Sequence, residues 1–87
     1  MKTFALNISS PEGDLFRGEA VKISLRGSEG DLAVMAGHVP FVTSVKPCEC
    51  LVELESGETI VGTTDGGILT VSGEKVTLLS GSFKFKE

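Results

Sequence analysis

The sequence has no tryptophan or tyrosine, and its 87 residues include a single histidine, two cysteines and three prolines. Its apolar runs fall far short of the roughly 20 residues that a membrane helix needs. No apolar stretch of signal-peptide length follows Lys2, so no secretory signal is expected. Basic residues are in deficit, with 8 Lys and Arg against 12 Asp and Glu, for a net charge of −4. A nucleic-acid-binding protein needs a basic surface to neutralise phosphates, so this class is excluded.

The single histidine, His38, leaves little scope for catalysis. No Ser or Cys is spaced to act with it as a nucleophile and base. Glu53 and Glu55 share one face of a predicted strand, but acidic residues that alternate with an apolar row are typical of a solvated face. The sequence Asp65-Gly66-Gly67 lacks the spacing and the following helix of a phosphate-binding loop. We therefore expect no catalytic residues and no cofactor, and a protein that is not an enzyme by itself.

The two cysteines, Cys48 and Cys50, lie two positions apart. On a strand this spacing places both side chains on one face, where a disulfide between them would be strained. In the absence of a secretory signal we expect reduced, buried thiols. Structural zinc needs about four ligands, and only His38 is available besides the thiols, so no metal site is expected. A small metal-dependent enzyme or sensor that uses these three residues is kept as an alternative.

What the sequence does contain is a period-two alternation of apolar and polar residues, within a globular composition of 40% hydrophobic and 23% charged residues. The alternation predicts about ten short strands, separated by turn residues, and eleven glycines support the same pattern. Gly18 is expected to interrupt the second strand. We predict an all-β fold, a ten-stranded β-sandwich or flattened barrel that forms one domain over residues 1–87. The predicted strands cover residues 3–9, 15–17, 21–26, 32–34, 41–45, 48–55, 59–63, 68–71, 76–79 and 83–86.

Two loops stand out as candidate binding elements. Residues 27–31 form an acidic, glycine-bounded tip that suits a polar or basic partner, although a solvated hairpin turn has the same composition. Residues 37–41 form a longer connection that holds apolar residues and the histidine. This connection fits either a structural corner or an exposed apolar edge that binds a protein.

In their order and spacing, the short motifs of this chain resemble the epsilon subunit of the F-type ATP synthase. The resemblance covers nearly the whole chain, apart from the last five or six residues. It rests on Thr43 and on residues 10–13 (SPEG), 18–19 (GE), 27–32 (GSEGDL), 37–40 (GHVP), 46–47 (KP), 66–71 (GGILTV) and 76–79 (VTLL).

The resemblance implies a ten-stranded β-sandwich that serves as a non-catalytic rotor subunit in the central stalk. Its implied partners are the gamma subunit and the ring of c subunits, and its implied role is to couple proton flow to ATP synthesis or hydrolysis. The implied location is the cytoplasmic face of the bacterial plasma membrane, as a peripheral protein held there only through the ATP synthase complex. A free-standing β-sandwich adaptor that binds a protein unrelated to ATP synthase is the alternative.

The same resemblance assigns two binding surfaces. An acidic tip complements basic loop residues and adds specificity, and apolar Val39 and Val42 would form the dry centre of the gamma contact. The residues implied to face the c ring are Ser28, Glu29, Gly30 and Asp31. The residues implied to face gamma are Ser10, His38, Val39, Pro40, Val42 and Thr43.

The chain departs from the family pattern in two regions. The family continues as a helical hairpin that inhibits hydrolysis and in some bacteria binds ATP, so neither activity is carried over to residues 1–87. The strand-like C-terminal residues 83–86 favour a naturally short form in which Phe83 and Phe85 cover the sandwich, and a truncated form of a longer chain is the alternative. Cys48-Glu49-Cys50 stands where the family has a glycine followed by apolar residues, and Glu49 and Glu53 make the outer face of that strand acidic.

Overall fold

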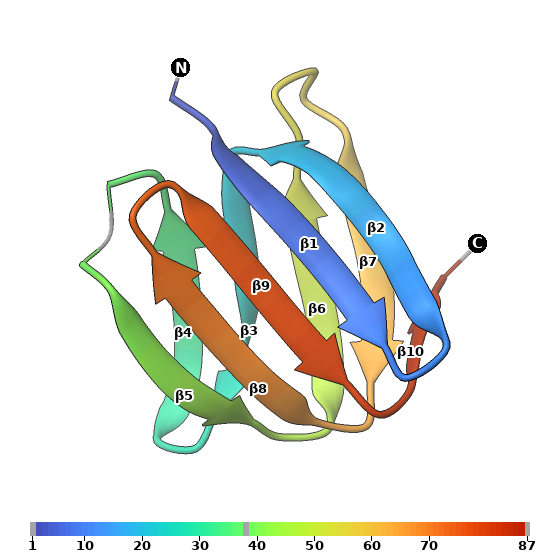
Figure 1. The fold of residues 1–87 in the computed structure, drawn as a ribbon. Coiled ribbons are helices and arrows are strands. Elements are labelled where there is room, and N and C mark those ends of the chain that lie inside the picture. Colours follow the sequence, from blue (N-terminus) through green and yellow to red (C-terminus); the bar gives the residue numbers. More distant parts are fainter. Residues whose placement is uncertain (1, 38, 87) are drawn as a thin grey trace.

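The computed structural model describes residues 2–37 and 39–86, and these residues form ten strands. The all-β prediction is confirmed (Figure 1). The strands are β1 (Phe4–Ser10), β2 (Gly13–Ala20), β3 (Lys22–Gly27), β4 (Gly30–Met35), β5 (Phe41–Val45), β6 (Cys48–Glu53), β7 (Thr59–Thr64), β8 (Gly67–Ser72), β9 (Lys75–Ser80) and β10 (Phe83–Phe85). No helix that could span a membrane occurs in this described part of the chain.

The ten strands form one sheet that folds over on itself into two layers. Its order is β10-β7-β6-β3-β5-β8-β9-β1-β2, and β4 pairs with β3 outside this path. All pairs are antiparallel except β1 with β9. Between β3 and β5 only Gly27 and Val45 pair, so the sheet turns a corner there. The layer β5-β8-β9-β1-β2 lies in front in Figure 1, and β10-β7-β6-β3-β4 forms the other layer.

The core lies between the two layers, as the period-two alternation predicts. In β1, Phe4, Leu6 and Ile8 are buried, whereas Ala5 between them is exposed. Alternate residues of a strand point to opposite faces of the sheet, so each strand contributes every second side chain to the core. The other buried apolar residues are Ala20, Ile23, Leu25, Val34, Val45, Cys50, Val52, Leu69, Val71, Val76, Leu78 and Phe83.

One expectation about the second strand is wrong. Gly18 does not interrupt it, because β2 continues through Gly18 in register with Leu6 of β1. The irregularity lies instead at Leu15, where the register with β1 shifts by one residue in a β-bulge. Gly18 leaves space for the ring of Phe16, whose Cζ would lie 3.3 Å from a Cβ at that position.

The C-terminal residues form a strand, as expected, and this strand lies at the seam between the two layers. Phe83 is buried over Gly62, where any side chain on the glycine would overlap its ring. The ring of Phe85 lies 5.0 Å from that of Phe83 and 6.4 Å from that of Phe16 on β2. These three rings cover the seam between the β10 and β2 edges of the sheet.

Candidate functional site

The acidic tip is a tight β-hairpin between β3 and β4. Gly27 and Gly30 pair, so Ser28 and Glu29 form a two-residue loop. Gly30 has a φ of 126°, which favours glycine over other residues. The residues that the resemblance assigns to the c ring, Ser28, Glu29, Gly30 and Asp31, are all exposed, and the tip lies at one end of the molecule (Figure 1).

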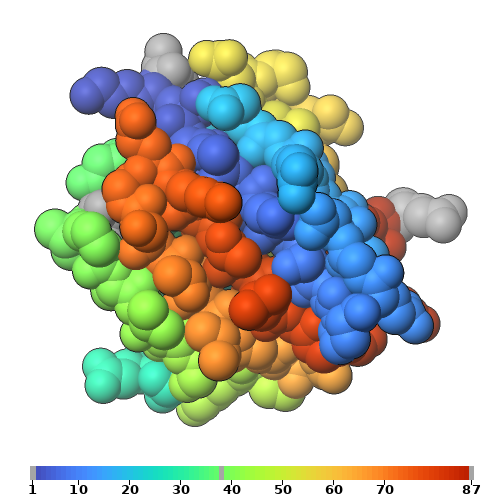
Figure 2. All heavy atoms as spheres, in the orientation of Figure 1, coloured from blue at the N-terminus to red at the C-terminus, as the bar shows by residue number. Residues whose placement is uncertain are grey.

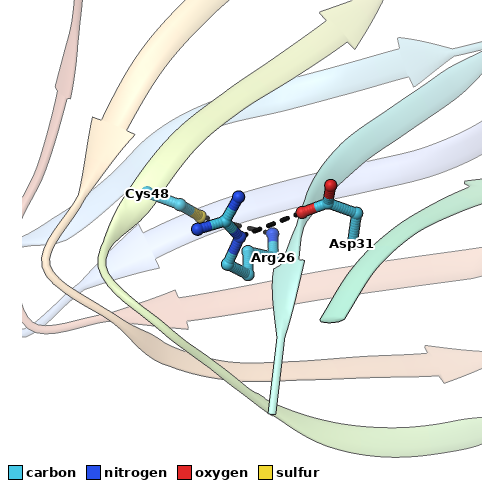
Figure 3. A network of polar contacts seen from close by, with 3 residues as sticks. All are labelled: Arg26, Asp31 and Cys48. Carbon is cyan, nitrogen blue, oxygen red and sulfur yellow. Dashed lines mark hydrogen bonds and ion pairs between the residues drawn. The ribbon is translucent and has the colours of Figure 1, made fainter. Parts of the chain in front are cut away.

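Within the tip, the two carboxylates have different surroundings. Asp31 is the cross-strand partner of Arg26, and Arg26 Nε donates to Asp31 Oδ1 at 3.0 Å (Figure 3). This hydrogen bond raises the pKa of Arg26. For Glu29, no ion pair is found with any residue that the structure describes. Arg26 therefore compensates the charge of Asp31, and Glu29 carries the net negative charge of the tip.

The two cysteines lie beside this ion pair on β6. Cys48 is half-buried, and its Sγ accepts a hydrogen bond from the backbone N–H of Arg26 at 3.3 Å (Figure 3). It borders a cavity of about 470 Å³ that Arg26 and Asp31 also line. Cys50 is fully buried, and burial, followed by the neighbouring Cys48, raises the pKa of its thiol to about 12. A thiol with so high a pKa stays protonated and is a poor nucleophile or metal ligand at neutral pH.

Both thiols are free; Cys50 is buried as expected, whereas Cys48 is only half-buried. Among residues 2–37 and 39–86 no three His, Cys, Asp or Glu side chains are placed to hold a metal ion together. The third residue of the metal alternative, His38, lies outside the described residues, as does its assignment to the gamma contact.

The outer surface of the layer β5-β8-β9-β1-β2, called here the front face, is turned toward the viewer in Figure 2. It carries exposed apolar residues. Val42 is 66% exposed, Ile68 48% and Leu79 52%. Ile68 and Leu79 are direct cross-strand partners, and Val42 lies diagonally across from Ile68, because its own partner is Thr70. Ile68, Leu79, Ser10 and Pro11 border an apolar hollow of about 400 Å³.

Two of the residues assigned to the gamma contact, Ser10 and Val42, are thus brought together around Ile68 and Leu79. The sequence analysis did not single out Ile68 and Leu79. Their signal was present in the alternation of β8 and β9, where Leu69 and Leu78 point into the core and their neighbours must point outward.

The other described residues assigned to the gamma contact, Val39, Pro40 and Thr43, lie elsewhere. Val39 is 69% exposed and Pro40 is exposed, in the connection between β4 and β5 at the end opposite the tip (Figure 1). Thr43 pairs with buried Leu69 and points to the other face of β5 from Val42, toward Gly27. The structure therefore spreads these residues along and around β5, and only Val42 and Ser10 border the apolar part of the front face.

A groove joins the tip to β5. It has a volume of about 510 Å³ and runs between β4 and β5, which diverge from the corner at Gly27 and Val45. Its walls include the whole tip, Leu32 of β4, and Val42 and Thr43 of β5. Residues assigned to two different partners therefore share one groove.

The acidic outer face of β6 is compensated by cations. Glu49 forms an ion pair with Lys86, and Glu53 lies 3.9 Å from Lys22 Nζ. Both pairs are partly exposed, so each contributes little to stability. Their effect is to leave this face close to neutral.

Comparison with known proteins places this arrangement in context. A protein-family model described as "ATP synthase, Delta/Epsilon chain, beta-sandwich domain" matches residues 3–86. The ATP synthase epsilon chain of Xanthomonas campestris pv. campestris (strain B100) is 38% identical over 79 residues, which is 91% of this chain and 56% of that protein. The chain thus spans about half the length of this relative.

Two solved structures contain similar chains. One is a cryo-EM structure of the Euglena gracilis mitochondrial ATP synthase with OSCP, F1 and the c-ring. The TM-score is 0.90 at 22% identity, covering 95% of this chain and 53% of the other. The second is the central stalk and c-ring of the Tetrahymena thermophila mitochondrial ATP synthase, with a TM-score of 0.76 at 12% identity, covering 94% of this chain and 66% of the other. At these identities the matches show a shared fold.

Proposed function

The chain belongs to the family of ATP synthase delta and epsilon chain β-sandwich domains, and from this premise we propose that it is a non-catalytic subunit of the central stalk of an F-type ATP synthase. In this role it binds the gamma subunit and the c ring and helps to couple ion flow to ATP synthesis or hydrolysis. The observation that carries the proposal is the family match over residues 3–86.

The front face is the surface proposed to bind gamma. Val42, Ile68 and Leu79 are adjacent, apolar and about half to two-thirds exposed. Burying adjacent apolar side chains is the main source of affinity at the centre of a protein interface. Ser10, beside the hollow at the end of the face, extends the same surface.

The tip is the surface proposed to face the c ring. It is narrow, exposed and negatively charged through Glu29, so it complements basic groups in a loop of the partner. Since the tip lies at one end of the molecule and the front face runs along its side, the two partners can be bound at once (Figure 1). The proposed location is peripheral, on the cytoplasmic side of a bacterial plasma membrane, and the contact with the membrane is made only through the complex.

Titration calorimetry with the recombinant cognate gamma subunit at moderate salt tests this proposal. We expect a one-to-one complex with micromolar or tighter affinity, and a parallel titration with an unrelated acidic β-sandwich protein should give no heat of binding. If a correctly folded cognate gamma does not bind, the stalk assignment is refuted. The chain would then be better described as an adaptor for another protein.

A further inference from the structure

Four strands of the described chain lie at an edge of the sheet. β2, β4 and β10 have a partner along only one side, and β5 has a full partner along one side and a single paired position on the other. An edge strand exposes unpaired backbone N–H and C=O groups, which can pair with a strand of another chain. Natural proteins usually block such edges with lysine, proline, bulges or a covering segment. The four edges of this molecule differ sharply in this respect.

Three of the edges are blocked. β10 has only three residues, and one of them is Lys84. β2 contains the bulge at Leu15, and its Phe16 packs against Phe85 across the seam. β5 follows Pro40, and the carbonyl of Ser44 on its open side already accepts a hydrogen bond from the N–H of Ser28 at 3.1 Å.

The fourth edge, β4 (Gly30–Met35), has no lysine, proline or bulge within its described residues. It is six residues long, contains no proline, lysine or arginine, and pairs with β3 without a shift in register. Gly27 and Gly30 close the hairpin and form a hydrogen-bonded pair. From this pair onward, hydrogen-bonded and non-hydrogen-bonded pairs alternate along β3 and β4. The backbone groups of Asp31, Ala33 and Met35 therefore point away from β3. On β3 the backbone of Arg26 likewise points away from β4, since its carbonyl accepts from Lys46 N–H at 2.9 Å.

The space beside this edge fits an added strand. The groove of about 510 Å³ between β4 and β5 borders the tip half of this edge, with Leu32 and Phe41 among its walls. A strand that paired with β4 would place alternate side chains in this groove and the others beside exposed Ala33 and Met35. At the tip end such a strand meets Glu29 and Asp31, so a basic residue there is complementary.

We propose that β4 accepts an extended segment of a partner chain as an added strand, with apolar side chains in the β4–β5 groove and a basic residue at the tip, and that the gamma subunit supplies it. This inference rests on the proposed function, because gamma is the proposed partner of the adjoining β5. Backbone pairing with a strand edge gives affinity, and the groove and the acidic end give specificity.

Hydrogen exchange of the one-to-one complex with cognate gamma tests the proposal directly. We expect the amides of Ala33 and Met35 to exchange at least about tenfold more slowly in the complex than in the free chain, because each gains a hydrogen bond. If gamma binds and these amides keep their free rates, the added strand is refuted while the stalk assignment stands. If gamma does not bind, both are refuted. Protection that depends on the concentration of the free chain alone would point to self-pairing of β4 and would also overturn the proposal.

A pair of variants at one position provides the second measurement. Ala33→Pro removes an N–H that points away from β3, whereas Ala33→Val keeps it. We expect Ala33→Pro to weaken gamma binding by about tenfold and Ala33→Val by less than about twofold. Met35→Lys, a change typical of blocked edges, serves if Ala33→Pro does not fold, and it should also weaken binding. If the folded Ala33→Pro variant, or Met35→Lys in its place, bound gamma as tightly as the original chain, the proposal would be contradicted.

Discussion

The hydroxyls of Thr64 and Ser80 lie 2.6 Å apart in the interior, and both residues are almost completely buried. Each hydroxyl has further partners: Thr64 Oγ1 accepts from Gly66 N–H at 3.0 Å, and Ser80 Oγ donates to the carbonyl of Ser82 at 2.8 Å. Asp65 adds to this network by accepting from Ser82 N–H at 3.0 Å. The network ties the turn between β7 and β8 to the turn between β9 and β10.

Replacing either Thr64 or Ser80 should lower the free energy of unfolding. Thr64→Val keeps the shape of the side chain but removes a partner of the buried Ser80 hydroxyl. We expect the free energy of unfolding to fall by about 1–3 kcal/mol, measured by urea denaturation. The double variant Thr64→Val with Ser80→Ala leaves fewer unpaired groups, so its loss should be smaller than the sum of the single losses. Strict additivity would contradict a direct interaction.

Gly67 should tolerate no side chain. A Cβ at this position would overlap the backbone carbonyl of Leu79, and a backbone atom of a central strand cannot move aside cheaply. We expect Gly67→Ala to lower the free energy of unfolding by about 3 kcal/mol or more. Gly18→Ala is the matched control, since its Cβ meets only the ring edge of Phe16 and its loss should stay near about 1 kcal/mol. Equal losses for the two variants would be inconsistent with this explanation.

Local patterns were sufficient to predict most strands and one contact of the site. The alternation Ile23, Leu25 against Lys22, Ser24 defines β3 without any other information. A two-residue hairpin after Gly27 necessarily places Arg26 opposite Asp31, so their ion pair could have been read from the sequence. The interruption expected at Gly18 does not occur, because the cost of a glycine inside a strand is small compared with the seven paired positions between β1 and β2.

The site itself depends on contacts between distant segments. Ile68 and Leu79 become neighbours of Ser10 only because β1 joins β9 in parallel, and no local signal specifies that pairing. The groove between β4 and β5 likewise exists because the sheet turns its corner at the single pair of Gly27 and Val45. Periodicity predicts which side of a strand faces outward, but it does not say which outward residues share a surface.

The buried thiol of Cys50 predicts a dependence of stability on alkaline pH. Its pKa is about 12 in the folded chain against an ordinary value of 9.0, so between these values the unfolded chain ionises and the folded chain does not. The free energy of unfolding keeps its full value below about pH 9 and falls as the pH rises toward 12. The limiting slope of this fall is about 1.4 kcal/mol per pH unit. Urea denaturation between pH 8 and 10.5 measures this slope. Cys50→Ala should have a shallower slope than the original chain. Cys48→Ala should keep most of the slope, because burial is the larger cause of the raised pKa of Cys50. A slope unchanged in Cys50→Ala would exclude the thiol as the cause.

The tip offers a test of the proposed contact with the c ring, in membranes that contain the assembled ATP synthase. Asp31→Lys removes the partner of Arg26 and places two cations where the tip now carries net negative charge. We expect ATP-driven proton pumping to fall relative to ATP hydrolysis, because like charges then face a basic partner. Glu74→Lys makes the same change of charge in the turn between β8 and β9, at the opposite end of the molecule, and should pump normally (Figure 1). Unchanged pumping with Asp31→Lys would argue against this placement of the tip.

The front face makes the sharpest prediction for gamma binding. Val42 is 66% exposed and borders Ile68, so Val42→Asp should leave the free chain folded while placing a carboxylate in the centre of the proposed interface. A charge that is buried there without a partner costs several kcal/mol, which corresponds to a loss of affinity of about a hundredfold or more. Thr59→Asp adds the same charge at an exposed position of β7, in the other layer. This variant should bind gamma as the original chain does. Titration calorimetry compares the two variants. If Val42→Asp bound with undiminished affinity, gamma would have to contact another surface, and Ile68 and Leu79 would lose their proposed role with it.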